Sequence, residues 1–183
     1  MRLIEAAHAK IKLIVKPGDI CIDATAGNGY DTLFLAKQIA PNGRVYAFDI
    51  QNSAIMQTSA RLKNSGLSHL IKLIHQPHQK VTDFIDQKDH HNIKVAMFNL
   101  GYLPGTDHCV TTTSKTTICA IENSHNLLKK GGLITIIGYR GHKGGVEETE
   151  EVLKLCKLKN WQYEAQEGNS NPLSPVLLYI TKN

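Results

Sequence analysis

Short apolar runs alternate with longer amphipathic stretches along the 183 residues of the chain. The short runs predict strands at 20–22, 44–49, 71–74, 92–99, 133–137, 161–167 and 176–181. The amphipathic stretches predict helices at 1–15, 53–64, 81–85, 115–128 and 146–158, and one that begins at Tyr30. Strands that alternate with helices indicate an α/β fold. Without a repeat or a linker in the pattern, we expect a single domain over 1–183, with the helix at 1–16 packed on it.

A strand, a glycine turn and a helix follow one another over 20–36. Asp23 ends the strand, and Gly27 and Gly29 form the turn. Because these glycines have no Cβ, the backbone can approach a ligand, and the helix that follows offers free N–H groups. The next strand ends in Asp49, about 20 residues further on, where such folds place the carboxylate that binds ribose hydroxyls. The two strand-end acids predict a nucleoside-type cofactor.

The details of the turn favour S-adenosylmethionine over a dinucleotide. Thr32 replaces the third glycine of the dinucleotide fingerprint, which weakens the case for a pyrophosphate at the helix end. Asp23 suits a cationic ligand better than a phosphate, and S-adenosylmethionine carries a sulfonium and an ammonium group. The stretch resembles motif I of class I methyltransferases, although Thr25 stands where many of them have glycine. Gln76 and His78, after the third strand, are candidates for the adenine edge.

The strand at 92–99 delivers a second motif, Asn-Leu-Gly-Tyr-Leu-Pro-Gly, over 99–105. It resembles a variant of the Asp/Asn-Pro-Pro-Tyr motif of amino-directed methyltransferases, in which Gly101 replaces a proline and an extra leucine intervenes. In that motif the Asn side-chain oxygen accepts hydrogens from the target amine. We therefore expect Asn99 to accept from the substrate and Tyr102 to stack on it or border it. The alternative is an ordinary turn with an Asn cap.

Two further segments are candidates for contacts with substrate. His8 lies beside the apolar stripe of the first helix, and we favour a surface position for it over a substrate contact. The basic, glycine-rich stretch 139–145 follows the fifth strand, and Arg140 and Lys143 fit either RNA phosphates or a flexible surface loop. Just before that strand, the Lys-Lys-Gly-Gly stretch at 129–132 is expected to end a helix.

Composition narrows the class of protein only in part. A formal net charge of +5 is compatible with an RNA partner, and a hydrophobic content of 42% fits a globular protein. The four cysteines form no Cys-x-x-Cys pair, so we expect reduced thiols in a cytoplasmic protein. No apolar run reaches the length of a membrane span, and His75 and His78 have no third ligand in view, so we expect neither a membrane segment nor a metal site.

Three motifs together resemble one family over nearly the whole chain. They are Asp-Ala-Thr-Ala-Gly-Asn-Gly-x-Asp-Thr-Leu-Phe-Leu-Ala at 23–36, Asn-Leu-Gly-Tyr-Leu-Pro-Gly at 99–105, and Gly-His-x-Gly-Gly-x-x-Glu at 141–148. The chain resembles the MnmM/YtqB-type tRNA 5-(aminomethyl)-2-thiouridylate methyltransferases, formerly described as rRNA methylases. The resemblance implies the Rossmann-like, seven-stranded sheet of class I methyltransferases, mostly parallel with an antiparallel last strand and helices on both faces.

The resemblance also implies an activity and a set of site residues. The activity is methyl transfer from S-adenosylmethionine to 5-aminomethyl-2-thiouridine at the wobble position, with the tRNA anticodon arm as partner. The implied catalytic residues are Asn99, Tyr102 and His142, and the implied cofactor contacts are Asp23, Thr25, Gly27, Asn28, Gly29, Asp31, Thr32, Asp49, Gln51, Gln76, His78 and Asn99. A homodimer is expected from the size class of the family alone.

Three other functions remain open on the residues alone. The same motifs would serve an rRNA base methyltransferase or a small-molecule amine methyltransferase, and a non-catalytic nucleoside-binding module that interacts with RNA is a further alternative. The last has no need of an amine-accepting Asn99. The proton acceptor for the amine also stays open among Asp23, His142 and water, because Asn99 can orient an amine but cannot act as a base.

Overall fold

The computed structural model describes residues 2–101 and 111–183. Its strands form one seven-stranded sheet in the order β3-β2-β1-β4-β5-β7-β6. The neighbouring strands from β3 to β5 are parallel, whereas β7 runs antiparallel to both β5 and β6. The strands are β1 (Ile20–Asp23), β2 (Arg44–Asp49), β3 (Ile71–His75), β4 (Ile93–Leu100), β5 (Leu128–Gly138), β6 (Gln162–Glu167) and β7 (Val176–Thr181). This arrangement confirms the predicted sheet, including its antiparallel last strand.

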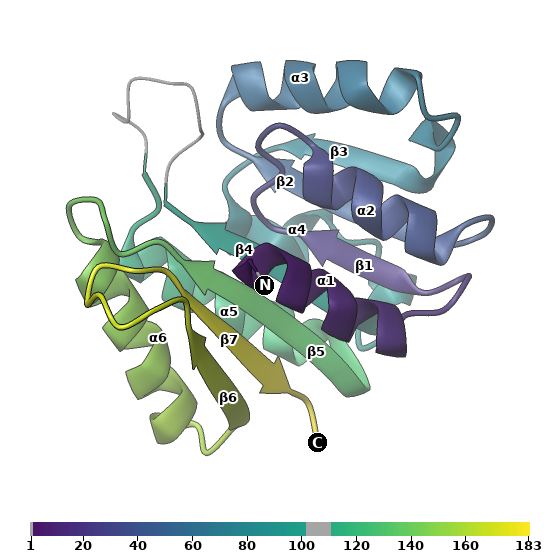
Figure 1. Ribbon diagram of the computed structural model, residues 1–183. Helices are drawn as coiled ribbons and strands as arrows, with labels where there is room; N and C mark the ends of the chain where they lie inside the picture. Colours follow the sequence, from purple (N-terminus) through teal and green to yellow (C-terminus); the bar gives the residue numbers. More distant parts are fainter. Residues whose placement is uncertain (1, 102–110) are drawn as a thin grey trace.

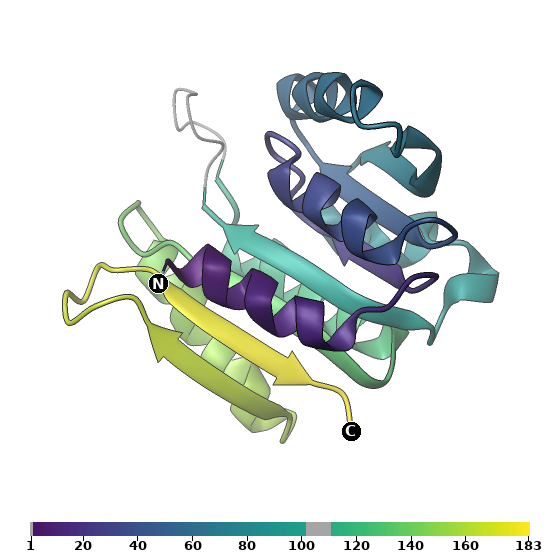
Figure 2. The same ribbon diagram turned by 45° about the vertical axis from the view of Figure 1, so that its right-hand side comes forward.

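Helices lie on both faces of the sheet, as predicted (Figure 1). One face packs against α1 (Leu3–Ile14) and α2 (Tyr30–Ile39), and the other packs against α4 (Val81–Phe84), α5 (Ser114–Leu127) and α6 (Gly145–Leu158). The helix α3 (Asn52–Lys63) flanks α2 and β3, and the 3-10 turns are η1 (Ser68–Leu70), η2 (His78–Lys80) and η3 (Gln87–Asp89). Figure 2 shows α1 in front of the sheet and alongside β7.

The two layers of helices explain why the central strands are apolar throughout. Along β2, Val45 and Ala47 join the core under α1 and α2, whereas Tyr46 and Phe48 join the core on the other face. All four side chains are fully buried. A strand that is covered on both sides loses the polar alternation of a half-exposed strand, which is why it reads as a continuous apolar run.

The strand order reverses between β1 and β4, which lie side by side in the centre of the sheet. In open α/β sheets, ligands bind outside the carboxyl ends of the strands at such a reversal. The glycine turn follows β1, and Asn99 lies at the carboxyl end of β4. The topology therefore brings the two sequence motifs to one place.

The structure corrects the prediction for 129–132. These residues were expected to end a helix, but α5 already ends at Leu127 and they belong to the start of β5. Leu128 pairs with Ile93 and Leu133 pairs with Val95, so 129–132 form a bulge opposite a single residue of β4. Gly131, with φ of +69°, supplies the backbone conformation that this bulge needs.

Candidate active site

The turn after β1 is organised by the buried carboxylate of Asp23. Its two oxygens accept hydrogen bonds from the backbone N–H of Thr25 at 3.2 Å and from the Thr32 hydroxyl at 2.6 Å. Burial, followed by the nearby charge of Asp31, raises the pKa of Asp23 above the ordinary range of a carboxyl group. Asp23 and Thr32 thus fix the strand-to-helix turn from beneath.

The glycines of this turn let α3 approach closely. Gly29 has φ of +79°, and a Cβ there would lie 2.9 Å from atoms of Thr58. The Thr58 hydroxyl donates to the carbonyl oxygen of Gly27 at 3.0 Å. Gly29 is therefore required both by its backbone conformation and by its contact with α3.

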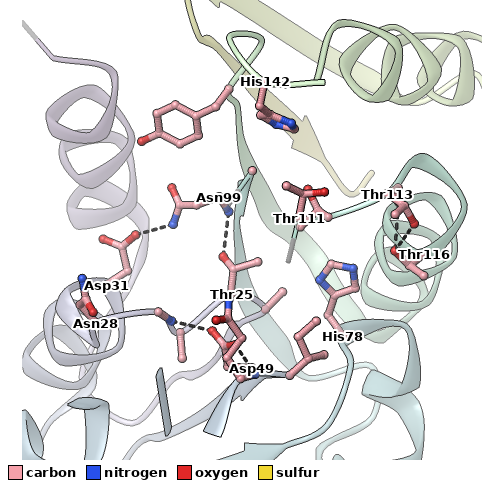
Figure 3. A pocket seen from close by; sticks show the side chains of 18 of the residues that line it. Thr25, Asn28, Asp31, Asp49, His78, Asn99, Thr111, Thr113, Thr116 and His142 are labelled. Atoms are coloured by element: carbon pink, nitrogen blue, oxygen red, sulfur yellow. Dashed lines mark hydrogen bonds between the residues drawn. The ribbon is translucent and has the colours of Figure 1, made fainter. Parts of the chain in front are cut away.

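Asp49 ends β2 and faces the same turn. Its Oδ2 accepts from the backbone N–H of Gly27 at 2.9 Å, and its Oδ1 accepts from the backbone N–H of Gln51 at 2.9 Å (Figure 3). Each carboxylate oxygen retains capacity for a second hydrogen bond. The carboxylate is thus held rigidly where it can accept from a pair of hydroxyl groups.

A cavity of about 880 Å³ opens at this edge of the sheet. Nine of the predicted site residues line it: Thr25, Gly27, Asn28, Asp31, Asp49, Gln51, His78, Asn99 and His142. Four others that were predicted to bind the cofactor do not line it: Asp23, Gly29, Thr32 and Gln76. Asp23 and Thr32 are fully buried and face each other, and Gly29 faces α3, so these three residues support the turn rather than border the cavity.

Asn99 is the centre of a hydrogen-bond network in the cavity wall. Its backbone N–H donates to Thr25 Oγ1 at 2.8 Å, and its side-chain Nδ2 donates to Asp31 Oδ2 at 2.8 Å (Figure 3). Thr25 therefore has a role that glycine at this position would not supply, because its hydroxyl joins the turn after β1 to the end of β4. Asp31 Oδ1 in turn lies 2.7 Å from Nε2 of His8.

His78 borders a different part of the cavity. Burial lowers the pKa of His78 to about 4, so the imidazole is neutral at physiological pH. Its ring lies 6.0 Å from that of Phe98, and Ile50 and Pro77 line the cavity beside it. This end is an uncharged, partly apolar wall, which suits a planar base.

The far wall is formed by residues that follow β5 and by the residues that follow 102–110. Thr112 donates from its backbone N–H to the carbonyl oxygen of Gly101 at 2.9 Å. Its hydroxyl and that of Thr117 both donate to the buried carboxylate of Glu148, at 2.7 and 2.6 Å. The glutamate of the third motif therefore anchors the start of α5 and the residues just before it.

Arg140 and His142 line this wall, and Arg140 lies 3.6 Å from a carboxylate oxygen of Glu167. His142 Nδ1 lies 3.1 Å from the carbonyl oxygen of Lys143. Tyr102, the predicted stacking residue, lies outside the described residues. The two interpretations of Arg140 and Lys143, as contacts for RNA phosphates or as part of a flexible surface loop, both stay predictions.

His8 lies against the wall of the site and not at the surface. It was expected at the surface, but it is half-buried, hydrogen-bonded to Asp31 and stacked on Phe34 with ring centroids 3.7 Å apart. The available signal was its spacing, because residues 4, 8 and 11 share one face of a helix and both neighbours are isoleucine. The contact with Asp31 joins two separate helices, so it cannot be predicted from a local sequence pattern.

The donor set of the cavity fits S-adenosylmethionine. Asn28 Oδ1 is buried without a hydrogen-bond partner among the described residues, which leaves an acceptor for a ligand ammonium group. Asp31 and Asp49 border the same space and provide the negative charge that a sulfonium ligand favours. Asp49 and the wall around His78 then suit a ribose and a base, respectively.

Comparison with known proteins identifies the fold and the cofactor. Two solved structures superpose over the whole chain: a "putative rRNA-methylase" from Clostridium thermocellum (39% identity, TM-score 0.92, 98% of that chain) and a "putative methyltransferase" from Streptococcus mutans in complex with SAH (31% identity, TM-score 0.84, 99% of that chain). The chain has the fold of a class I methyltransferase and is an enzyme that uses S-adenosylmethionine, as predicted.

The family follows from two sequence comparisons. A sequence model of the family described as "Putative rRNA methylase" matches residues 45–180. A chloroplastic tRNA (mnm5s2U34) methyltransferase of Arabidopsis thaliana is 36% identical over 97% of this chain and 68% of its own length. The chain belongs to the family that this model describes, and the resemblance seen in its three motifs is confirmed.

Among residues 2–101 and 111–183, no helix is long and apolar enough to cross a membrane. In the same ranges, no cluster of three or more His, Cys, Asp or Glu side chains is arranged to hold a metal ion.

Proposed function

We propose that this methyltransferase acts on the primary amine of 5-aminomethyl-2-thiouridine at the tRNA wobble position and forms 5-methylaminomethyl-2-thiouridine. The observation that carries the proposal is the orientation of the Asn99 amide. Its nitrogen is held by Asp31, so its oxygen is left for a hydrogen-bond donor in the cavity. The relative from Arabidopsis, whose name specifies mnm5s2U34 in tRNA, supports the same substrate.

The chain's own residues have a limited task in this reaction. When bound, S-adenosylmethionine supplies a methyl group whose C–S bond breaks as the amine lone pair forms the new C–N bond. Asn99 accepts an N–H of the amine and thereby directs its lone pair, which is a positioning effect. Tyr139, which lies beside Gly101 at the end of β4, lines the cavity on this side and limits the contact of the amine with water, which disfavours its protonated, unreactive form.

An RNA substrate is supported by the residues at the mouth of the cavity. Tyr30 is 65% exposed, and the guanidinium of Arg61 stacks on its ring at 3.6 Å from the centroid. Arg61 is itself held by a 2.7 Å hydrogen bond from Nε to the carbonyl oxygen of Asn28. Exposed aromatic rings and arginine planes are the surfaces on which unpaired RNA bases stack. A cytoplasmic location and a homodimer remain predictions that belong with this proposal.

The test is methyl transfer from labelled S-adenosylmethionine to three acceptors: tRNA that carries the aminomethyl group, ribosomal RNA, and a free alkylamine. We expect label in the tRNA alone. Label in ribosomal RNA alone would support the rRNA alternative, which the description of the family favours. Label in the free amine with no effect of tRNA would support a small-molecule enzyme.

The role of Asn99 is tested in the same assay. Asn99→Ala should bind S-adenosylmethionine nearly as the wild type does, but transfer methyl roughly 100-fold more slowly, a loss typical of a misplaced acceptor. Asn126→Ala, at an exposed position of α5, is the matched control and should behave as wild type. Unchanged turnover of Asn99→Ala would remove Asn99 from the site.

A further inference from the structure

Three side chains from three separate elements form a continuous chain of contacts beside the cavity. His8 comes from α1, Asp31 from α2 and Asn99 from β4. His8 Nε2 lies 2.7 Å from Asp31 Oδ1, and Asn99 Nδ2 lies 2.8 Å from Asp31 Oδ2. The side chains of His8 and Asp31 are only 25% and 11% exposed. The carboxylate of Asp31 thus contacts both His8, from a helix outside the glycine motif, and Asn99, the residue that faces the methyl acceptor.

The chemistry of a carboxylate fixes the direction of both contacts. An ionised carboxylate only accepts hydrogen bonds, so the atoms that face Asp31 must be N–H donors. The amide of Asn99 therefore presents its nitrogen to Asp31 and its oxygen to the opposite side. By the same argument, His8 donates from Nε2–H.

The position of the histidine ring is set independently of Asp31. The ring stacks on Phe34, with an interplanar angle of 6° and centroids 3.7 Å apart. Phe34 lies one turn along α2 from Asp31, so a single helix carries both the stacking surface and the acceptor. This arrangement holds the imidazole in the plane from which its N–H reaches the carboxylate.

We propose that His8 and Asp31 are positioning residues that lock the Asn99 amide with its oxygen toward the methyl acceptor. The site then selects a group that donates a hydrogen and keeps a lone pair, as an amine does, and rejects an acceptor atom that carries no hydrogen. Donation to a charged carboxylate also polarises the amide, which strengthens its oxygen as an acceptor. Through His8, the helix α1 thus contributes one positioning residue to the site. This inference rests on the proposed function of the same site.

An exchange of the two side chains tests the coupling between Asp31 and Asn99. Asn99→Asp alone places two carboxylates against each other and should lower methyl transfer roughly 100-fold, because neither carboxylate can donate to the other. The double variant Asn99→Asp with Asp31→Asn restores one donor and one acceptor in the same space, with the remaining oxygen of residue 99 toward the amine. We expect it to recover at least about tenfold over Asn99→Asp, a coupling of the size seen between residues in contact.

His8 is tested by a change that keeps the stack and removes the donor. His8→Phe should lower kcat about tenfold, with the KM for tRNA and the affinity for S-adenosylmethionine within about twofold of wild type, because only the orientation of Asn99 is released. Lys10→Gln, on the same helix in an exposed ion pair with Glu164, is the matched control. Calorimetric titration with S-adenosylmethionine shows that each variant is folded.

The outcomes separate this inference from the proposed function. If wild-type protein fails to methylate the aminomethyl tRNA, the proposed function is wrong. If the wild type is active but the exchange variant is no faster than Asn99→Asp, or His8→Phe keeps full kcat, the positioning role is overturned. If the loss of affinity for S-adenosylmethionine in Asp31→Asn accounts in full for its loss of rate, Asp31 acts on the cofactor alone, and the positioning role is also overturned.

Discussion

The hydrogen bond between Thr25 and Asn99 joins the two sequence motifs, and Thr25→Val removes it with almost no change of volume. In the wild type, the Asn99 backbone N–H donates to Thr25 Oγ1 at 2.8 Å. Valine offers a methyl group there, so the N–H loses its partner. An unsatisfied buried donor costs about 1–3 kcal/mol, and the partial exposure of Asn99 places this case in the lower half, at about 1–2 kcal/mol.

The loss should appear in both stability and activity. For a chain of this size, about 1–2 kcal/mol lowers Tm by about 2–8 °C. Methyl transfer should fall about tenfold or more, because the end of β4 carries the side chain that orients the amine. Thr25→Ser keeps the hydroxyl and is the matched control. Thermal unfolding and single-turnover methyl transfer are the assays, and a Thr25→Val protein that matches Thr25→Ser in both would refute the reasoning.

Three further predictions concern the cofactor and the fold. Asp49→Asn should weaken S-adenosylmethionine binding about 10- to 100-fold by calorimetry, since one charged hydrogen-bond acceptor is worth about 1.5–3 kcal/mol; unaltered affinity would remove its ribose role. Gly29→Ala should lower the free energy of unfolding by about 2 kcal/mol or more in urea, because its Cβ would meet Thr58 at φ of +79°, and wild-type stability would contradict that contact. Burial lowers the pKa of His78 from 6.5 to about 4, so the unfolded state binds more protons between these values and wild-type stability gains up to about 3 kcal/mol as pH rises through this window. His78→Gln should lack this gain in stability. Asp23, whose raised pKa makes stability fall as pH rises, contributes equally to both proteins, so its effect cancels when the stability of the variant is subtracted from that of the wild type at each pH. Equal pH dependence of the two proteins would count against a buried neutral His78.

Much of the site could be predicted because its chemistry sits at strand ends. The spacing from the glycine turn to Asp49 and the apolar run before Asn99 are local signals, and the parallel topology brings their ends together. The alternation of strands and helices likewise identified the sheet. These features depend on periodicity and on residue type, which a single sequence displays directly.

Other features depend on contacts between distant segments. In the sequence, Asp23 and Asp49 have the same position at the end of a strand. In the structure, Asp23 is buried under the turn and hydrogen-bonded to Thr32, and of the two only Asp49 borders the cavity. His8 reads as a polar residue beside an apolar stripe, and its partner Asp31 is 23 positions away. Which side chain reaches the cavity depends on how the helices pack, and local patterns do not contain that information.

The bulge at 129–132 also depends on a contact between distant segments. The stretch 129–132 has the lysines and glycines of a helix end, and the prediction for it was wrong. The pairing of Leu128 with Ile93 draws these residues into β5, and the backbone of Gly131 bonds to that of Lys182 near the C-terminus. Tertiary pairing overrides local propensity here.

The central claim is methyl transfer to the wobble aminomethyl group, and nucleoside mass spectrometry tests it most directly. Transfer RNA from a strain that lacks this gene is digested before and after incubation with the purified protein and S-adenosylmethionine. We predict that 5-aminomethyl-2-thiouridine is present at first and is then replaced by 5-methylaminomethyl-2-thiouridine. If 5-aminomethyl-2-thiouridine persists, in tRNA shown to contain it and with protein shown to bind S-adenosylmethionine, the account is contradicted.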